Sequence, residues 1–332
     1  MSRVRLKPID GQVIVITGAS SGIGLVTARL AIERGAKVML VSRDAAALQS
    51  IVTALGENAD FAAADVGDAG AVEAVAQATI DRFGRIDSWI NVAGVAIYAK
   101  LLDTPMDEHE RLFRTNYFGV VHSALAAIPR LRQTGGAFIT VASIVSDLPA
   151  PVMGAYAASK HAVKGYIDSL RIEVTGDALP IAITLIKPSG TDTPIADHAA
   201  NHLDGAALLP PPVYDPAVVA EAILDATVHP RREVTVGGIG RAQVLAATHF
   251  PQALDWMGGV FARLLRDPSR PPSSGDNLGA PVRNGRERSR DQTGRSFSLY
   301  TAAERNKGAL AGGLLLAGVA IAAGRRLRAS GK

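Results

Sequence analysis

A short apolar run near the start of the chain leads directly into a glycine-rich turn and then into a helical pattern. The run is residues 12–17, QVIVIT, whose length and β-branched residues are typical of a buried strand. The turn is 18–24, GASSGIG, and the helical pattern covers 25–34. Glycines let the backbone turn tightly and approach a pyrophosphate, whose charge is favoured at a helix N-terminus. This order predicts a dinucleotide-binding unit, although an ordinary strand–helix loop can carry the same glycines.

Alternation of apolar runs and helical patterns continues along the chain. Further strands are predicted over residues 37–42, 60–64, 87–92, 137–142, 181–186 and 233–236. Helices are predicted over residues 45–55, 68–83, 104–130 and 215–228, with one more around Tyr156. Such alternation predicts an α/β fold with a doubly wound, mostly parallel, Rossmann-like sheet. Because ligands of these sheets bind beyond the carboxyl ends of the strands, we expect the functional residues at strand ends.

Composition excludes several other classes of protein. Almost half of the 332 residues are hydrophobic, which allows a sizeable core. The chain has no cysteine, so it cannot form a disulfide, a catalytic thiolate or a Cys-ligated metal centre, and we predict no metal site. The net charge of +4 comes from basic residues concentrated in 283–295 and 325–332, which argues against a nucleic-acid partner for the folded body. The first residues lack the apolar core of a signal peptide, so we expect a cytoplasmic protein.

A serine at a predicted strand end is followed by a tyrosine and a lysine spaced as helix neighbours. Ser143 follows the run 137–142, and Tyr156 and Lys160 lie four apart in a helical pattern. Residues at i and i+4 share a helix face, so the phenol and the ammonium can point into one cleft. The ammonium would favour the phenolate and bring its acid–base chemistry nearer to neutral pH. Taken alone, the pair is better explained as a core tyrosine and a solvated lysine, because short motifs recur by chance.

The second predicted strand ends without a carboxylate. A carboxylate there would accept hydrogen bonds from the adenosine ribose and repel a 2′-phosphate. The sequence instead has Ser42 and Arg43, and a guanidinium is suited to phosphate. We therefore predict NADP(H) in preference to NAD(H). Two alternatives stay open: Arg43 is merely solvated, or Asp44 bonds the ribose, although Asp44 is better placed to cap the following helix.

Small and polar residues follow the other predicted strands. Asp65 and Val66 follow the third strand, where the carboxylate could meet an adenine amine or simply accept bonds in a turn. The fourth strand ends in residues 91–94, NVAG, and the sixth leads into 187–193, KPSGTDT. Asn116 lies in an apolar stretch of a predicted helix, where a buried amide needs hydrogen-bond partners.

Together these motifs resemble the short-chain dehydrogenase/reductase family over about residues 7–240. Each motif alone is weak, but their joint order is specific, with Tyr156 thirteen residues after Ser143 and downstream of the glycine turn. The resemblance implies an oxidoreductase that transfers a hydride between a nicotinamide cofactor and an alcohol or carbonyl group. The hydride chemistry would belong to the cofactor.

The resemblance also implies a role for each residue. Tyr156 would donate a proton to a carbonyl oxygen or accept one from an alcohol, and Ser143 would hydrogen-bond that oxygen. Lys160 would hold the nicotinamide ribose and lower the pKa of Tyr156, and Asn116 would anchor a water that relays protons. The expected cofactor contacts are Gly18, Ser20, Ser21, Gly22, Ile23, Gly24, Arg43, Asp65, Val66, Asn91, Ala93, Gly94, Tyr156, Lys160, Pro188, Thr191 and Thr193.

Two stretches depart from the family's usual pattern. The family commonly has Asn-Asn-Ala-Gly where this chain has Val92 in the second position. It also commonly has Pro-Gly-x-Val-x-Thr where this chain has residues 188–193, PSGTDT. Thr193 remains to bond the carboxamide of the nicotinamide, whereas Ser189 and Thr191 leave the local loop geometry unspecified. No catalytic position is lost.

Apolar residues between Ser143 and Tyr156 and in the irregular segment 194–212 point to the substrate. They predict a small lipophilic ketone, aldehyde or secondary alcohol, such as a steroid, retinoid or fatty-acyl derivative. The predicted preference for NADPH makes reduction the expected direction. The alternative is that these side chains pack a lid and never touch substrate. The residues are Ile144, Val145, Leu148, Pro149, Val152, Met153, Ile195, Leu203, Leu208 and Leu209.

The end of the chain differs in composition from the rest. We predict a dehydrogenase domain over 1–266, a flexible linker over 267–306 rich in Pro, Ser, Gly and Arg, and an apolar segment over 307–332. As a helix, the uncharged run 308–324 would span about 25 Å, which is short for a hydrocarbon core of roughly 30 Å. The basic residues after it conflict with a simple anchor, because positive flanks and the domain would both prefer the cytoplasmic side. We predict membrane contact through 308–328, as an anchor or a surface helix; the alternative is a helix packed on a partner subunit.

Two functions of different classes compete at this point. The leading one is an NADP(H)-dependent carbonyl reductase, which we expect to form a homo-oligomer. The other is an NADP(H)-binding sensor or membrane scaffold with little turnover. The intact set of Asn116, Ser143, Tyr156 and Lys160 favours the enzyme, because a sensor need not keep it.

Overall fold

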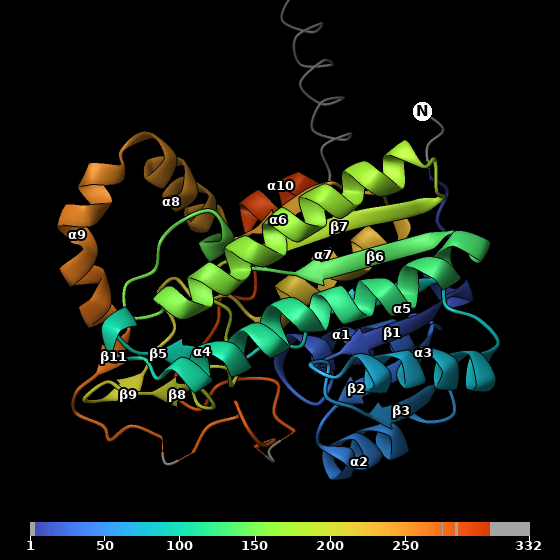
Figure 1. The fold of residues 1–332 in the computed structure, drawn as a ribbon, viewed down its shortest axis with the longest axis horizontal. Helices are drawn as coiled ribbons and strands as arrows, with labels where there is room; N and C mark the ends of the chain where they lie inside the picture. The colour runs from blue at the N-terminus through green and yellow to red at the C-terminus, as the bar shows by residue number, and fades with distance from the viewer. Residues whose placement is uncertain (1–3, 274, 283–284, 306–332) are drawn as a thin grey trace, which may run out of the picture.

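The computed structural model describes residues 4–273, 275–282 and 285–305, in which seven parallel strands form one central sheet (Figure 1). The strand order is β10-β7-β6-β4-β1-β2-β3. The strands are β1 (Val13–Thr17), β2 (Lys37–Ser42), β3 (Ala59–Ala63), β4 (Ser88–Asn91), β6 (Gly136–Val141), β7 (Ile181–Pro188) and β10 (Glu233–Val236). The predicted doubly wound α/β sheet is confirmed.

Helices cover both faces of the sheet because its strands are apolar on both sides. In β1, Ile14 and Ile16 pack into the core on one face and Val15 into the core on the other. Alternating side chains of a strand point to opposite faces, so a strand without polar positions needs two covering layers. The first face carries α1 (Gly22–Glu33), α2 (Ala45–Leu55) and α7 (Pro216–Val228); the second carries α3 (Ala69–Phe83), α5 (Gly119–Thr134) and α6 (Gly154–Gly176).

Carboxylate caps fix where several of these helices begin. Asp44 accepts a hydrogen bond from Ala47 N at 3.0 Å, and Asp68 accepts one from Ala71 N at 3.0 Å. Asp215 caps α7 in the same way, at 2.9 Å from Ala217 N. Each cap satisfies an N–H that the first helical turn cannot pair internally. The predicted cap at Asp44 is thus present in the structure.

The predicted helix over 104–130 is interrupted. It consists of α4 (Met106–Phe113), a π-helical turn (Arg114–Phe118) and then α5, which continues to Thr134. The buried Asn116 lies inside the π-helical turn. The Asn116 amide forms hydrogen bonds with the backbone of Val95. The helical periodicity of the sequence does not indicate this contact.

Several shorter elements lie at one end of the molecule, beyond the carboxyl edge of the sheet (Figure 1). Helices α8 (Gly238–His249) and α9 (Pro251–Leu264), which we did not predict, lie at this end, and α9 and the start of α6 line one cavity. Two small sheets pair β5 (Ile97–Tyr98) with β8 (Ala200–Asn201) and β9 (Ala206–Ala207) with β11 (Arg266–Asp267). The irregular segment 194–212 therefore contains two short strands. Three-residue 3₁₀ turns occur at Ile9–Gly11, Leu101–Asp103 and Ile144–Ser146.

Several described residues of the predicted linker over 267–306 contact the domain. Leu278 is buried among Val95, Leu112 and other apolar side chains. The short helix α10 (Leu299–Arg305) follows, and Thr301 in it accepts a hydrogen bond from Gly237 N at 3.0 Å. These described residues lie on the domain because hydrogen bonds and a few apolar anchors hold them, despite their polar composition.

The apolar run 308–324 lies outside the described residues, and the predicted membrane contact through 308–328 stays a prediction. Within the described ranges, none of the helices combines the length and the hydrophobicity needed to traverse a bilayer.

Candidate active site

The glycine turn after β1 brings backbone N–H groups to the start of α1. Gly22 has a φ of +53°, a conformation that side chains with a Cβ rarely adopt. A Cβ on Gly24 would lie 2.2 Å from the carbonyl oxygen of Gly18, so the turn can fold this tightly only with glycine. The turn therefore presents a helix N-terminus at the carboxyl edge of the sheet, which favours an anionic ligand.

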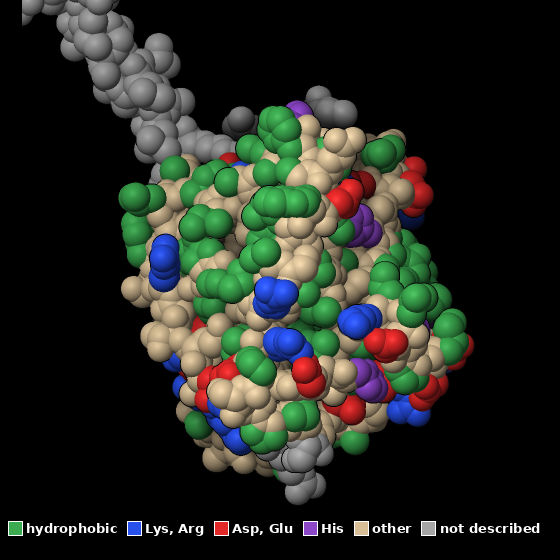
Figure 2. Space-filling model, turned by 90° about the vertical axis from the view of Figure 1, so that its left-hand side faces the viewer, with side chains coloured by type: hydrophobic (Ala, Val, Ile, Leu, Met, Phe, Trp, Pro, Cys, Tyr) green, Lys and Arg blue, Asp and Glu red, His purple; other side chains and the backbone are tan. Residues whose placement is uncertain are grey.

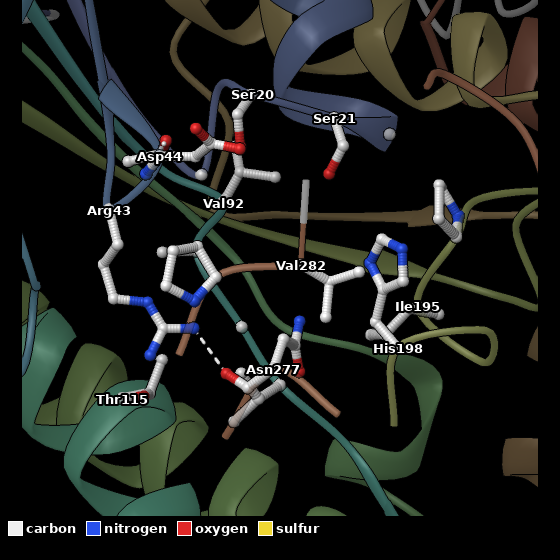
Figure 3. Close-up of a pocket in the computed structure, with 18 of the residues that line it drawn as sticks. Ser20, Ser21, Arg43, Asp44, Val92, Thr115, Ile195, His198, Asn277 and Val282 are labelled. Atoms are coloured by element: carbon white, nitrogen blue, oxygen red, sulfur yellow. Dashed lines mark hydrogen bonds between the residues drawn. The ribbon is translucent and has the colours of Figure 1, made fainter. Parts of the chain in front are cut away.

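A cleft of about 180 Å³ lies in front of this turn (Figure 3). Ser20 and Ser21 lie on one side of it, with Arg43, Asn277 and His198 around the opening. Donors from the turn and the guanidinium of Arg43 suit the phosphates of a dinucleotide. Of the predicted cofactor contacts, eleven line this cleft: Gly18, Ser20, Ser21, Gly22, Ile23, Arg43, Asp65, Val66, Ala93, Gly94 and Thr193.

The polar residues at the ends of β2 and β3 are already bonded within the protein. Arg43 donates to the backbone carbonyls of Leu278, at 3.1 Å, and of Asn277, so it is not merely solvated. Asp44 lines the cleft while capping α2. Asp65 accepts a hydrogen bond from Gly67 N at 2.8 Å, which is the turn role considered above, and it also lines the cleft.

A second cavity, of about 140 Å³, shares lining residues with the cleft and is lined by three of the four predicted catalytic residues, Ser143, Tyr156 and Lys160. Ser143 follows β6, and Tyr156 and Lys160 lie in the first turns of α6. The Lys160 ammonium lies 5.6 Å from the centre of the Tyr156 ring and donates to the Val141 carbonyl at 3.1 Å. Pro188, Thr191 and Thr193 also line this cavity. Residues that follow the carboxyl ends of β4, β6 and β7 thus line the same cavity.

Burial dominates the protonation of the tyrosine and the lysine. It raises the pKa of Tyr156 to about 12, although the hydrogen bond with Ser143 acts in the opposite direction. It lowers the pKa of Lys160 to about 8. Desolvation of the phenolate therefore dominates the pKa of Tyr156 in this structure, and a lowering of that pKa by Lys160 stays a prediction. At neutral pH the phenol carries its proton and can act as an acid.

Asn116 lies behind this cavity and joins two of its walls. Its oxygen accepts from Val95 N at 2.9 Å, and its nitrogen donates to the Val95 carbonyl and the Ser159 hydroxyl, both at 3.0 Å. A Cβ on Gly94 would lie 3.5 Å from the Asn116 oxygen and 3.8 Å from the Lys160 nitrogen. The side chain therefore ties the segment after β4 to α6 beside Lys160.

The comparisons with known proteins agree with this geometry. The pattern of the family described as short chain dehydrogenase matches residues 12–204, which is more than half of the chain. The chain belongs to the short-chain dehydrogenase/reductase family. It is 39% identical over 260 residues to the uncharacterised oxidoreductase YxnA of Bacillus subtilis (strain 168), covering 76% of this chain and 73% of that protein. It is also 33% identical over 257 residues to dehydrogenase/reductase SDR family member 7B of Danio rerio, covering 72% and 82%.

Solved structures of short-chain dehydrogenases/reductases share the fold. One from Burkholderia phymatum in complex with NAD has a TM-score of 0.68 at 24% identity, covering 80% of this chain and 99% of that one. One from Burkholderia cenocepacia J2315 in complex with NADP has a TM-score of 0.65 at 25% identity, covering 76% and 99%. The family match and the relatives show that the protein is an oxidoreductase of this family, and these two solved neighbours bind NAD and NADP.

Two predicted cofactor contacts of this dehydrogenase/reductase lie behind the walls of the cavities. The Asn91 amide donates to the Thr140 hydroxyl at 3.2 Å and accepts from the Trp89 indole at 3.1 Å, so it is used within the sheet. Gly24 packs on Gly18 and shapes the turn. For both residues, the structure indicates a supporting role in place of a direct contact.

The sequence reasoning missed residues that come from far along the chain. Asn277, Pro281 and Val282 line the cofactor cleft, and α9 lines a third cavity. Leu278 and Val282 are large apolar residues in the mostly polar predicted linker. Their presence was the one sequence feature that could have indicated contact with the domain.

The third cavity measures about 640 Å³ and is mostly apolar. It lies between α9, the segment 144–154 and the start of α6. Four residues, Ile144, Val145, Met153 and Pro210, line both this cavity and the catalytic one. The predicted catalytic residues Ser143, Tyr156 and Lys160 therefore lie between a polar cleft and an apolar cavity.

Proposed function

We propose that the protein is an NADP(H)-dependent reductase of lipophilic ketones or aldehydes. The observation that carries the proposal is the position of Ser143, Tyr156 and Lys160 at the junction of the phosphate-suited cleft and the apolar cavity. Ile144 and Met153 line both the apolar cavity and the catalytic cavity. A substrate in the apolar cavity would reach the phenol of Tyr156 past these two side chains.

In this proposal the phenol of Tyr156 is the acid. Bound NADPH would supply the hydride that the carbonyl carbon accepts, and it would itself be oxidised to NADP⁺. Ser143 hydrogen-bonds the carbonyl oxygen and Tyr156 gives it a proton, so the product is an alcohol and the phenol is left as phenolate. Lys160 stabilises that phenolate and orients the nicotinamide ribose. Asn116, beside Lys160, would position the water that returns a proton.

Arg43 is the residue that we expect to select NADPH. Replacing Arg43 by Leu should raise the Kd of NADPH about tenfold to a hundredfold, because a charged hydrogen bond to the 2′-phosphate is lost. The Kd of NADH should change far less, since NADH lacks that phosphate. Titration of cofactor fluorescence measures both constants.

The ratio of the NADPH Kd to the NADH Kd reports the contact of Arg43 with the 2′-phosphate alone. Loss of the Arg43 bonds to the carbonyls of Asn277 and Leu278 acts on both cofactors equally. Arg82→Leu is a suitable control, because Arg82 is exposed and pairs with Asp60 at 3.0 Å. Equal losses for NADPH and NADH in Arg43→Leu would contradict the assignment.

Figure 2 looks onto the end of the molecule that carries α8 and α9, where hydrophobic side chains are spread between a few charged ones. Phe261 lines the apolar cavity from α9, whereas Trp256 on the same helix is 87% exposed. Phe261→Asp should raise KM for a lipophilic carbonyl by about tenfold or more, because a carboxylate would replace apolar contact with the substrate. The KM of a small carbonyl such as propanal should stay nearly constant.

A panel of carbonyl compounds with NADPH and NADH tests the proposed function. Trp256→Asp introduces the same charge on the outer side of α9 and should leave KM unchanged. If Phe261→Asp behaves like Trp256→Asp, the cavity does not hold substrate. Cofactor binding without turnover of any compound would favour the sensor.

We also propose that the protein forms a homo-oligomer. Exposed apolar side chains on the outer helices support this: Leu125 of α5 is 67% exposed and Ile172 of α6 is 70% exposed. Such side chains are typical of surfaces that another subunit covers.

A further inference from the structure

Two parts of the C-terminal segment, residues 276–282 and 285–289, lie at the cofactor cleft and next to the glycine turn, and we call these two parts the C-terminal strap. Asn277, Pro281 and Val282 line the cleft directly, and Figure 3 shows Val282 in front of it and Asn277 next to Arg43. The strap belongs to the stretch 267–306, which the sequence predicted to be a flexible linker. Three groups of contacts hold the strap at the cleft.

The first anchor of the strap lies at the Arg43 end of the cleft. Arg43 donates to the carbonyls of Leu278 and Asn277, and Asn277 N donates to the His198 carbonyl at 2.9 Å. The Leu278 side chain is only 7% exposed and packs with Val95 and Leu112. Polar and apolar contacts together therefore fix residues 277 and 278.

The second contact lies at the glycine turn. Gly22 N, at the start of α1, donates to the Arg286 carbonyl at 2.9 Å. The Arg286 guanidinium donates to Asp197 at 2.9 Å, and Glu287 pairs with Arg29 of α1 at 3.1 Å. The strap thus joins α1 to the segment after β7 on the opposite side of the cleft.

The far anchor lies beyond the cleft. Asp192 accepts from Ser289 N at 2.9 Å and from the Ser289 hydroxyl at 2.6 Å, and also from Gly294 N at 3.1 Å. Asp192 is only 2% exposed, so these bonds are shielded from water. Asp192 lies next to Thr193, which lines both the cleft and the catalytic cavity.

The strap uses the donors that a dinucleotide phosphate needs. A backbone carbonyl and a phosphate oxygen are both acceptors, and Arg43 and Gly22 N–H each donate to a strap carbonyl. Arg43 and Gly22 N–H must therefore exchange the strap carbonyls for phosphate oxygens when a dinucleotide binds. The bonds to Asp197 and Asp192, in contrast, do not compete with that ligand and can hold the strap over it.

We propose that the C-terminal strap is a gate over the cofactor cleft, which closes on the bound cofactor and must release Asp197 and Asp192 before the cofactor exchanges. The proposal rests on the NADP(H) site proposed above. It assigns a function in cofactor exchange to Arg286 and Ser289, which take no part in the chemistry.

Loosening the strap should accelerate cofactor exchange in both directions. In the double variant Arg286→Ala/Ser289→Ala, the side-chain bonds to Asp197 and Asp192 are removed. We expect the association and the dissociation rate constants of NADPH each to rise about tenfold or more, because a charged hydrogen bond and a second bond no longer hold the gate. Stopped-flow fluorescence of NADPH with the full-length protein measures both constants.

Arg290→Ala is the matched control, since Arg290 is exposed and carries the same charge one residue beyond the strap. Its rate constants should equal those of the wild type. Rates within twofold of the wild type in the double variant would overturn the gate. A rise in association alone would also overturn it, because the strap would then only compete with the cofactor and not close over it.

A second measurement needs no variant. Arg286 and Arg288 are trypsin sites within the strap, and a gate closed on its ligand protects them. We expect NADPH to slow cleavage after Arg286 and Arg288 in the wild type; cleavage at an unchanged or faster rate would contradict the proposal. Both experiments omit the substrate, so they can succeed even if the protein turns over no carbonyl compound and the proposed function fails.

Discussion

Tyr156→Phe is expected to lower the turnover of a lipophilic carbonyl by about 10²–10⁴-fold, the usual contribution of a general acid. The phenol of the half-buried Tyr156 lies between Ser143 and Lys160, and its desolvation raises the pKa of Tyr156 to about 12. It therefore holds a proton at neutral pH and can release it to a developing alkoxide. Phenylalanine keeps the ring and its packing with Met153 but has no proton to give.

Cofactor binding separates this effect from damage to the fold. The Kd of NADPH should change by no more than about fivefold in Tyr156→Phe, because at most one neutral hydrogen bond is lost. Tyr166→Phe, ten residues further along α6, makes the same chemical change away from the cavities and should retain wild-type turnover. Wild-type turnover in Tyr156→Phe would remove the phenol from the mechanism.

Lys160→Met is expected to stabilise the protein at pH 7 while lowering turnover about a hundredfold. Burial lowers the pKa of Lys160 from 10.5 to about 8, so the folded protein holds a buried charge at neutral pH that the unfolded chain exposes to water. This difference corresponds to roughly 3 kcal/mol. Loss of the hydrogen bond to the Val141 carbonyl takes away about 1 kcal/mol, so we expect a net gain of about 2 kcal/mol in the free energy of unfolding.

The sign of this effect depends on pH in a defined way. Below pH 8 the lysine is protonated in both states, and the cost of the buried charge is fully present. Between pH 8 and 10.5 the unfolded state binds more protons, so wild-type stability contributed by Lys160 rises with pH. The variant lacks this rise, and the difference between the two proteins should shrink from pH 7 to pH 10. Urea unfolding at both pH values measures it.

Lys164→Met provides the control on the same helix. Burial lowers the pKa of Lys164, but its bonds with Asp168 and its proximity to Asp147 raise that pKa overall. Removing this partnered lysine should lower stability slightly, opposite in sign to Lys160→Met. A variant Lys160→Met that is less stable than the wild type at pH 7 would contradict the electrostatic reasoning.

The local patterns of the sequence were sufficient to predict the sheet, and they also placed the candidate catalytic residues at its carboxyl edge. Strand-length apolar runs separated by helical patterns specify a parallel sheet, and parallel strands bring their carboxyl ends to one edge. Tyr156 and Lys160 share a face because of their spacing alone. Ser143 joins them because its strand ends at the same edge.

Only the tertiary structure decided the environment of these residues. The π-helical turn at Asn116 depends on Val95, and the pKa values of Tyr156 and Lys160 depend on how deeply the surrounding elements bury them. The bond between Arg43 and Asn277 joins residues 234 positions apart. Periodicity reports which side of a single element is apolar, whereas burial, charge and closure of the cleft depend on contacts between elements. The sequence alone therefore determined the sheet and the catalytic spacing, and the tertiary structure decided which residues cover the cofactor cleft.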